Sequence, residues 1–265
     1  MRISFIGAGK MAEGIVSAMD AAQRAGVAMF DKDHARTSSL AAKYGVSAAP
    51  SAEAALAGAQ LVFLAVRPQD AGEAAAACAR HLAPGATVVS ILAGKSLASL
   101  AALFPSAAGI VRVMPNLALR AKEGMCAICA TPDAPESAVA AVERILSAAG
   151  KTVRLEERHF DAVTALSGSG PAYFAYMQKA MQTAGEALGL PREAAALLSA
   201  QTMYGTAKFL RESGVGLDAV IDGVCTKGGT TAAGMEKRAS GAFDAAVRDT
   251  LAAAALRSAE LGRIG

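Results

Sequence analysis

The chain has 265 residues, with 26 basic and 23 acidic side chains and a formal net charge of +3. This small, dispersed excess of positive charge does not predict a nucleic-acid surface, and the aromatic content of 5% without Trp argues against a base-stacking platform. No apolar run reaches the roughly 18 residues of a membrane helix, and the opening segment is interpreted as a strand rather than a signal peptide, so we expect a cytoplasmic protein.

The first 155 residues alternate short apolar runs with helical stretches. Runs rich in Val, Ile, Leu or Phe predict buried strands at residues 2–6, 27–31, 61–66, 87–91, 109–114, 125–129 and 152–155. Helices are predicted between them, at residues 10–24, 35–44, 51–58, 71–81, 96–103 and 135–149. Strand–helix alternation with such short connections predicts an α/β fold with a doubly wound parallel sheet.

The strand signal disappears after about residue 156. The remaining chain predicts helices at residues 160–188, 192–212, 217–223, 231–238 and 243–261. We therefore expect two domains, a sheet domain over residues 1–156 and an all-helical domain over residues 157–265. The many small residues of the second domain favour a helical face that packs against another copy of the chain, and hence a homo-oligomer.

Cys126 and Cys129 form a CxxC motif within the apolar segment MCAICA. A structural zinc site normally needs a second ligand pair, and the three histidines are scattered along the chain. We interpret the motif as part of a buried strand and expect no metal site.

A glycine-rich turn lies between the first predicted strand and the first predicted helix. The string FIGAGKMAEG has the pattern GxGxxA, formed by Gly7, Gly9 and Ala12. The first glycine allows a sharp turn, the second lets a pyrophosphate approach the backbone, and the small third residue lets the helix pack on the strand. Free N–H groups at the helix start favour the phosphates, so the segment predicts a dinucleotide site.

The end of the second strand bears on the choice of coenzyme. Asp31 lies about 20 residues beyond the glycine turn, where an acidic residue usually accepts hydrogen bonds from the adenosine ribose of NAD. Lys32 and Arg36 are also placed to pair with the 2′-phosphate of NADP. The sequence leaves NAD and NADP open. Other strand ends should line the cofactor at residues 65–68, 91–94 and 114–116, which include Ala93 and Asn116.

Two segments of the second half place glycines within helical patterns. The string ALSGSGPAYF covers residues 165–174, and VCTKGGTTAAGMEK covers residues 224–237. In the latter, Gly228 and Gly229 predict a loop, and Thr230 and Thr231 open the next helix. The backbone N–H groups of that helix start are suited to bind a carboxylate.

Together, FIGAGKMAEGI, FLAVRPQ, RVMPN, EGM, TALSGSGPAYF and VCTKGGTTAAGMEK resemble the pyrroline-5-carboxylate reductase family along the whole chain. The resemblance implies NAD(P)H-dependent reduction of 1-pyrroline-5-carboxylate to L-proline, the last step of proline synthesis. It implies a Rossmann-type domain followed by an all-helical domain for dimerisation and substrate binding. It further implies homodimers that assemble up to decamers, with each active site between the nucleotide domain of one subunit and the helical domain of its partner.

The resemblance also assigns roles to matching residues. The pyrophosphate is expected on the glycine turn, at Gly7, Ala8, Gly9, Lys10 and Met11. The resemblance places Ala65, Val66, Arg67 and Pro68 beside the cofactor and Ser51 near the adenosine ribose. These residues add to Asp31 and Lys32, which the end of the second strand already indicated. The substrate carboxylate and ring nitrogen are expected on Thr226, Gly228, Gly229, Thr230 and Thr231. Thr231 matches the threonine whose hydroxyl contacts that nitrogen and is the candidate catalytic residue.

The chain departs from the family at several positions. Lys10 stands where asparagine is usual, Leu117 and Ala118 replace Thr-Pro, and Lys227 replaces proline. Residues 30–33, FDKD, lack the Ser or Asn-Arg often tied to NADPH.

Two alternative functions remain open at this point. One is a related imine reductase or 3-hydroxyacid dehydrogenase, which would use a lysine or aspartate where this chain has Ser167, Ser169 and Tyr173. The other is a nucleotide-sensing protein without catalysis.

Overall fold

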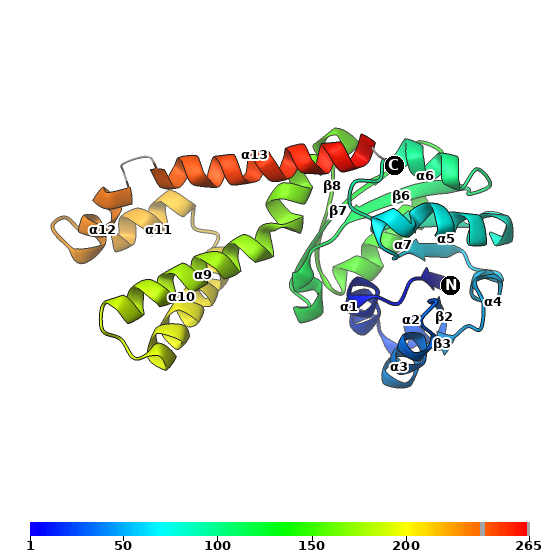
Figure 1. The fold of residues 1–265 in the computed structure, drawn as a ribbon, viewed down its shortest axis with the longest axis horizontal. Coiled ribbons are helices and arrows are strands. Elements are labelled where there is room, and N and C mark those ends of the chain that lie inside the picture. Colours follow the sequence, from blue (N-terminus) through cyan, green and yellow to red (C-terminus); the bar gives the residue numbers. More distant parts are fainter. Residues whose placement is uncertain (239–241, 264–265) are drawn as a thin grey trace. The chain divides into compact units, whose positions relative to one another are not determined.

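The computed structural model describes residues 1–238 and 242–263, without the side chains of Arg238 and Arg263. The contacts divide the chain into two compact units, Met1–Ser169 with Ala253–Gly265, and Gly170–Ala252 (Figure 1). This division by contacts falls thirteen residues beyond the predicted boundary at residue 156, and it assigns the end of the last helix to the first unit.

Within the described part of the first unit, eight strands form one sheet in the order β3-β2-β1-β4-β5-β6-β7-β8. The strands are β1 (Ile3–Ile6), β2 (Val27–Phe30), β3 (Ser47–Ala48), β4 (Leu61–Leu64), β5 (Thr87–Ser90), β6 (Gly109–Met114), β7 (Gly124–Ala130) and β8 (Gly150–Arg154). Neighbouring strands pair in parallel, which confirms the predicted Rossmann-type sheet, except that β7 runs antiparallel to β6. The expectation of a fully parallel sheet was wrong there, because the 3₁₀ turn η3 (Leu117–Ala121) is too short for a crossover.

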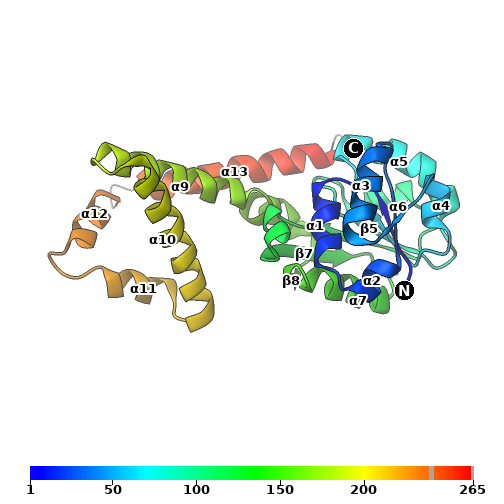
Figure 2. The same cartoon turned by 90° about the horizontal axis from the view of Figure 1, so that it is seen from below.

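Helices cover both faces of this sheet (Figure 2). One face, which includes Phe5, Phe63 and Val111, packs against α1 (Lys10–Ala18), α3 (His34–Tyr44) and α7 (Glu136–Ser147). The other face, which includes Ile6, Leu64 and Val88, packs against α4 (Ala52–Leu56), α5 (Ala71–Cys78) and α6 (Leu97–Leu103). Adjacent residues on one strand therefore belong to opposite cores, as the nearly continuous apolar runs predict for a doubly wound sheet.

The predicted helix at residues 10–24 is interrupted. The structure has α1 followed by a separate helix α2 (Ala21–Ala25), with Met19 and Asp20 extended between them. Asp20 caps α2: its carboxylate accepts a hydrogen bond from the Gln23 N–H, and the Gln23 side chain accepts one from the Asp20 N–H. This reciprocal cap gives the chain a new helix start and ends the first helix early. The two-residue edge strand β3 also went unpredicted, because it contains no apolar run.

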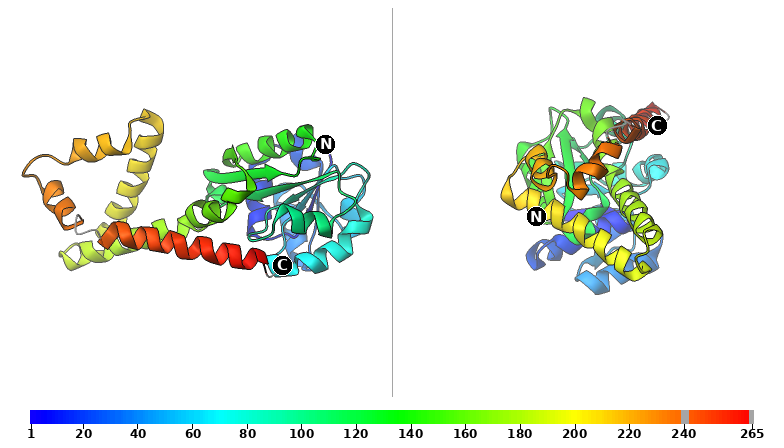
Figure 3. Two further views of the ribbon diagram at one scale, coloured as in Figure 1. Left: turned by 90° about the horizontal axis from the view of Figure 1, so that it is seen from above. Right: turned by 90° about the vertical axis from the view of Figure 1, so that its left-hand side faces the viewer.

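The second half is helical, as predicted. The helices α9 (Gly170–Ala187), α10 (Arg192–Ser213), α11 (Leu217–Val224), α12 (Thr230–Arg238) and α13 (Ala242–Arg263) follow one another. Helices α9 and α10 are in contact, and Figure 3 shows the yellow α10 leaving the turn after α9 at a wide angle. The predicted helix at residues 160–188 is not continuous. It consists of α8 (Phe160–Val163), a π-helical turn at Thr164–Gly168, and α9. The SGSGP string therefore marks a local change in helical hydrogen bonding.

The second unit exposes large apolar side chains. Leu188 is 86% exposed and Leu197 69%, and Tyr204 and Phe209 on α10 are more than half exposed. Large apolar side chains that are exposed in this way are typical of a surface that packs against another protein chain. In the part of the chain that the structure describes, no helix combines the length and hydrophobicity that crossing a membrane requires.

Candidate active site

The glycine turn joins β1 to α1. Gly7 has a φ of +102°, and a Cβ at this position would lie 2.6 Å from the backbone of Ala65. Only glycine therefore fits at this point. Gly9 is the N-cap of α1, no side chain caps the helix, and a Cβ on Gly9 would meet no atom within 4 Å. The first N–H groups of α1 thus face open space, as an anion-binding helix start requires.

Asp31, at the end of β2, holds this turn in place. Its Oδ2 accepts a hydrogen bond of 2.7 Å from the Ala8 N–H, and its Oδ1 accepts one of 2.9 Å from the Asp33 N–H. The side chain is 17% exposed, and Arg36 lies 3.6 Å from Oδ2. The carboxylate is therefore fixed in orientation at the edge of the glycine turn.

A cavity of about 920 Å³ opens at the carboxyl ends of β1, β2, β4 and β5. This is the edge where open α/β sheets bind ligands. Eleven of the predicted cofactor residues line the cavity: Gly7, Gly9, Lys10, Met11, Asp31, Lys32, Ala65, Val66, Arg67, Pro68 and Ala93. The shape and the free helix start fit a dinucleotide whose pyrophosphate lies on α1.

Three predicted cofactor residues do not line this cavity. Ala8 lies within the turn and donates to Asp31. Ser51 caps α4, where its hydroxyl accepts a 3.1 Å hydrogen bond from the Ala54 N–H. The Asn116 side chain accepts hydrogen bonds from Ala118 and Met125 and donates one of 3.4 Å to Ser167. Their contact with the cofactor stays a prediction.

The cavity carries charged side chains that the sequence did not assign to it. Glu73 at the start of α5 forms an ion pair with Lys32. Asp70 lies 2.8 Å from Arg67 and raises the pKa of that guanidinium through their hydrogen bond. No sequence motif connects Glu73 or Asp70 with the glycine turn, because the sheet brings them there from sixty or more residues away.

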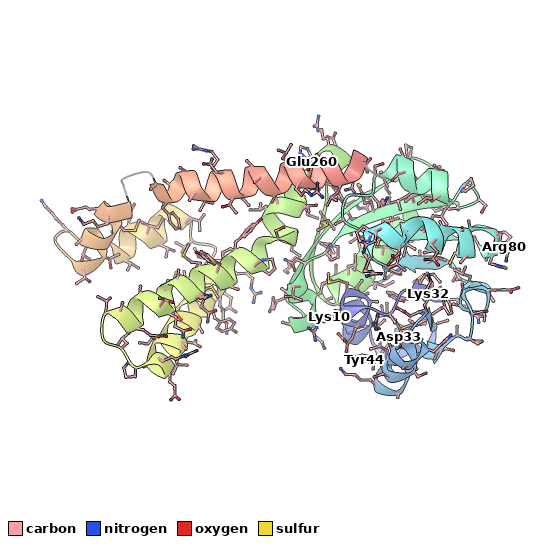
Figure 4. The ribbon with its side chains drawn as sticks, in the orientation of Figure 1. Lys10, Lys32, Asp33, Tyr44, Arg80 and Glu260 are labelled. Carbon is pink, nitrogen blue, oxygen red and sulfur yellow. The ribbon has the colours of Figure 1, made fainter. Side chains whose placement is uncertain are left out.

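Lys10 differs from these cavity cations. It is the first residue of α1, its side chain is exposed, and it forms no ion pair with any carboxylate among the described side chains. Figure 4 labels Lys10, together with Lys32 and Asp33 from the end of β2. A free ammonium group thus stands at the helix start where the phosphates are expected.

The predicted substrate loop lies in the second unit, between α11 and α12. The Gly229 N–H donates a 2.9 Å hydrogen bond to the Thr226 carbonyl, and Gly228 has a φ of +73°. A Cβ on Gly229 would lie 2.6 Å from Thr226 Oγ1, so a side chain at this position would require Thr226 to shift. The Gly229 carbonyl accepts from the Ala233 N–H, which starts α12 at Thr230, one residue before the predicted start.

All five residues predicted to bind the substrate lie in this turn or in the first two residues of α12: Thr226, Gly228, Gly229, Thr230 and Thr231. Thr230 is exposed and Thr231 half-buried. The N–H groups that follow Gly229 are the unpaired donors of a helix start, which suit a carboxylate.

The CxxC motif lies on β7, as expected for core residues. Cys126 is fully buried, and burial raises the pKa of its thiol to about 12. Burial also raises the pKa of Cys129 to about 12, with a smaller contribution from the nearby Glu157 carboxylate. Among residues 1–238 and 242–263, no three His, Cys, Asp or Glu side chains are grouped to hold a metal ion. The high pKa values indicate thiols of low reactivity.

Comparisons with known proteins agree with this architecture. Residues 157–261 match the family model described as pyrroline-5-carboxylate reductase dimerisation, and residues 2–94 match that described as NADP oxidoreductase coenzyme F420-dependent. The chain is 36% identical to the pyrroline-5-carboxylate reductase of Pseudomonas aeruginosa, over 98% of this chain and 96% of that protein. It is also 36% identical to the enzyme of Synechocystis, over 99% of each chain.

Solved structures show the same relationship. A pyrroline-5-carboxylate reductase from Coxiella burnetii superimposes with a TM-score of 0.92 at 28% identity, covering 98% of each chain. The 1-pyrroline-5-carboxylate reductase from Streptococcus pyogenes has a TM-score of 0.85 at 26% identity, also over 98% of each chain. The chain therefore belongs to the pyrroline-5-carboxylate reductase family.

Proposed function

We infer that this protein reduces 1-pyrroline-5-carboxylate to L-proline with NADPH or NADH. One observation carries the inference: the same chain combines a large cavity at an uncapped helix start, suited to a dinucleotide, with a second helix start at Gly229–Thr231, whose N–H groups suit a carboxylate. The curated relatives that share its full length are reductases named for this substrate. A general imine reductase does not need the second helix start, and a 3-hydroxyacid dehydrogenase would use a lysine or aspartate where this chain has Ser167, Ser169 and Tyr173.

The reaction demands little acid–base chemistry from the protein. The substrate is a cyclic imine that carries a carboxylate, and the reduced nicotinamide supplies a hydride to the imine carbon. A protonated imine is already electrophilic, so the side chains mainly hold the imine carbon and the nicotinamide in the orientation that hydride transfer requires.

The substrate loop provides this orientation. The N–H groups at the start of α12 bind the carboxylate, and the Thr231 hydroxyl hydrogen-bonds to the ring nitrogen. A threonine hydroxyl is a poor acid, so Thr231 orients the nitrogen and does not act as a general acid. The half-buried position of Thr231 beside the exposed Thr230 limits the freedom of its side chain.

The helical domain supports self-association, because residues 157–261 match a dimerisation family and their apolar side chains are exposed. We take the homodimer as the minimal unit, with the coenzyme cavity of one subunit combined with the substrate loop of its partner. Assembly of dimers into a decamer belongs to the same proposal and is tested by the mass from sedimentation equilibrium. The free thiols at Cys78, Cys126, Cys129 and Cys225 suit the reducing cytoplasm, where we place the reaction.

A coupled measurement tests the reductase assignment. Purified protein is mixed with pyrroline-5-carboxylate and each reduced coenzyme, and coenzyme oxidation and proline formation are followed together. We expect equal amounts of oxidised coenzyme and proline. Coenzyme that binds without any proline being formed would leave a nucleotide-sensing protein and remove the reductase assignment.

A further inference from the structure

The coenzyme cavity holds most of its charged groups on one side. In a doubly wound sheet, the pyrophosphate lies at the start of α1 and the adenosine extends over the end of β2. The cavity walls on that side come from the end of β2, from the start of α3, from η1 (Pro68–Asp70), and from the start of α5. Their charged residues are three cations and four carboxylates: Lys32, Arg36, Arg67, Asp31, Asp33, Asp70 and Glu73.

Each of these three cations is already paired with a carboxylate. Lys32 bonds to Glu73, and Arg67 lies 2.8 Å from Asp70. Arg36 lies 3.3 Å from Asp33 and 3.6 Å from Asp31. The adenosine side therefore carries no cation free of a carboxylate among the described residues, and its carboxylates exceed its cations by one.

NADPH differs from NADH by a 2′-phosphate, which adds close to two negative charges at neutral pH. To bind that phosphate, Lys32 or Arg36 would have to share or give up its contact with a carboxylate. Asp31 would stay close to the phosphate, because the Ala8 and Asp33 N–H groups hold its carboxylate in place. A ribose 2′-hydroxyl, by contrast, donates a hydrogen bond to such a carboxylate.

Lys10 stands outside this group of charges. It is the first residue of α1 and has no carboxylate partner among the described side chains. Its ammonium group adds to the positive end of the helix, where the pyrophosphate common to both coenzymes binds. Lys10 therefore raises the affinity for NADH and NADPH alike.

We propose that this chain selects NADH over NADPH through the carboxylates of Asp31, Asp33 and Glu73, while Lys10 supplies affinity shared by both coenzymes. The inference rests on the proposed function, because it takes the cavity to be the coenzyme site. It assigns a role in coenzyme specificity to Glu73. This residue lies on α5, away from the glycine turn before α1, and belongs to no coenzyme motif.

Binding without substrate tests the proposal directly. Calorimetric titrations measure the Kd of the purified protein for NADH, NADPH, ADP-ribose and 2′-phospho-ADP-ribose. We expect each 2′-phosphorylated ligand to bind about tenfold or more weakly than its counterpart. Because the exposed charges are screened by salt, the ratio should shrink as the ionic strength rises.

The double variant Asp33→Asn/Glu73→Gln removes two carboxylates and frees Lys32. Asparagine caps a helix as well as aspartate, so α3 should keep its N-cap. We expect the ratio of the two Kd values to fall about tenfold, mainly through tighter binding of the phosphorylated ligand. Asp31 is left intact, because its loss would also loosen the glycine turn.

Two matched variants serve as controls. Lys10→Asn should weaken the binding of NADH and of NADPH by similar factors and leave the ratio of the two Kd values unchanged. Asp133→Asn removes an exposed carboxylate away from the cavity and should change neither Kd.

Equal or tighter binding of NADPH in the wild-type protein would overturn the proposal. The proposal would also be overturned if the double variant had the wild-type ratio of the two Kd values while circular dichroism showed that it was folded. If NADH bound tenfold more tightly than NADPH but the protein formed no proline, the coenzyme preference would stand. Only the reductase assignment would then be refuted.

Discussion

The Ala8 N–H donates a 2.7 Å hydrogen bond to the Asp31 carboxylate, across 23 residues of sequence. This bond connects the glycine turn after β1 to the end of β2. Asp31 therefore shapes the turn that presents the start of α1, in addition to any contact it makes with a ribose.

Replacing Asp31 by alanine tests this connection. The variant leaves the Ala8 and Asp33 N–H groups without their acceptor, so we expect the free energy of unfolding to fall by about 1–2 kcal/mol. We also expect faster hydrogen exchange of the Ala8 amide and weaker NADH binding. Urea unfolding and exchange measured by NMR check the prediction, with the exposed Asp133→Ala as control. Unchanged exchange at Ala8 would contradict it.

The two glycines of the turn should respond differently to the same substitution. Gly7→Ala combines a positive φ with a contact of 2.6 Å to the Ala65 backbone, so we expect a loss of stability of about 2 kcal/mol or more. Gly9→Ala meets no protein atom within 4 Å, and its methyl group projects into the space of the pyrophosphate. We expect near wild-type stability with coenzyme affinity about tenfold lower.

Thermal unfolding and coenzyme titration of both variants separate these two effects. If Gly9→Ala bound NADH as tightly as the wild type, the pyrophosphate would not lie on this turn.

Much of this architecture follows from the sequence, because apolar runs buried on both faces produce strong signals. The strands that flank the glycine turn begin and end within a residue or two of their predicted positions. The direction of β7 did not follow, because an apolar run has the same pattern in either direction and the reversal depends on the short η3 connection. The break between α1 and α2 had a readable signal, the Asp20–Gln23 capping box.

The cavity was predictable where its residues directly follow strands or belong to the glycine turn. Glu73 and Asp70 were not, because their place in the cavity depends on how the chain after β4 turns back over the sheet. Ser51 shows the opposite difficulty, since a serine before a helix suits both an N-cap and a ligand contact, and the structure uses it as a cap.

The substrate loop makes a specific prediction about a hydroxyl group. Thr231→Val keeps the shape of the side chain and removes the hydrogen bond to the ring nitrogen, so we expect kcat to fall about tenfold or more with the fold intact. Thr231→Ser keeps the hydroxyl and should retain most of the activity. Steady-state kinetics with pyrroline-5-carboxylate check this pair. If the valine variant had the kinetics of the wild type, Thr231 would not belong to the site.

Stability should depend on pH through an ion-pair network between α7 and β8. Arg154 lies 2.6 Å from Glu136 and 2.7 Å from Glu143, and its hydrogen bonds lower the pKa of both carboxyls below 4.5. Carboxyls with lowered folded-state pKa values stabilise the fold above pH 4.5, and this contribution is lost as the pH falls through those values. Glu143→Gln should therefore be less stable than the wild type at neutral pH.

The stability difference between Glu143→Gln and the wild type should shrink as the pH falls below about 4. Urea unfolding across this range measures it, and Asp133→Asn, which removes an exposed carboxylate between β7 and α7, is the control. A difference that stays constant with pH would show that Glu143 acts through packing and not through its charge.

Combining two variants that are defective in different parts of the site tests whether each active site is shared between subunits. Gly9→Val blocks the coenzyme cavity, because its side chain fills the space at the start of α1, and Thr231→Val disables the substrate loop. If a site takes its cavity from one subunit and its loop from the other, each mixed dimer contains one site with both parts intact and one site with both defects. Random mixing makes half of the dimers mixed, so activity should recover to about a quarter of the wild-type value. Co-expression with two different affinity tags isolates the mixed dimers, in which half of the sites should be active. Mixed dimers no more active than the Thr231→Val homodimer would mean that cavity and loop of the same subunit form the site.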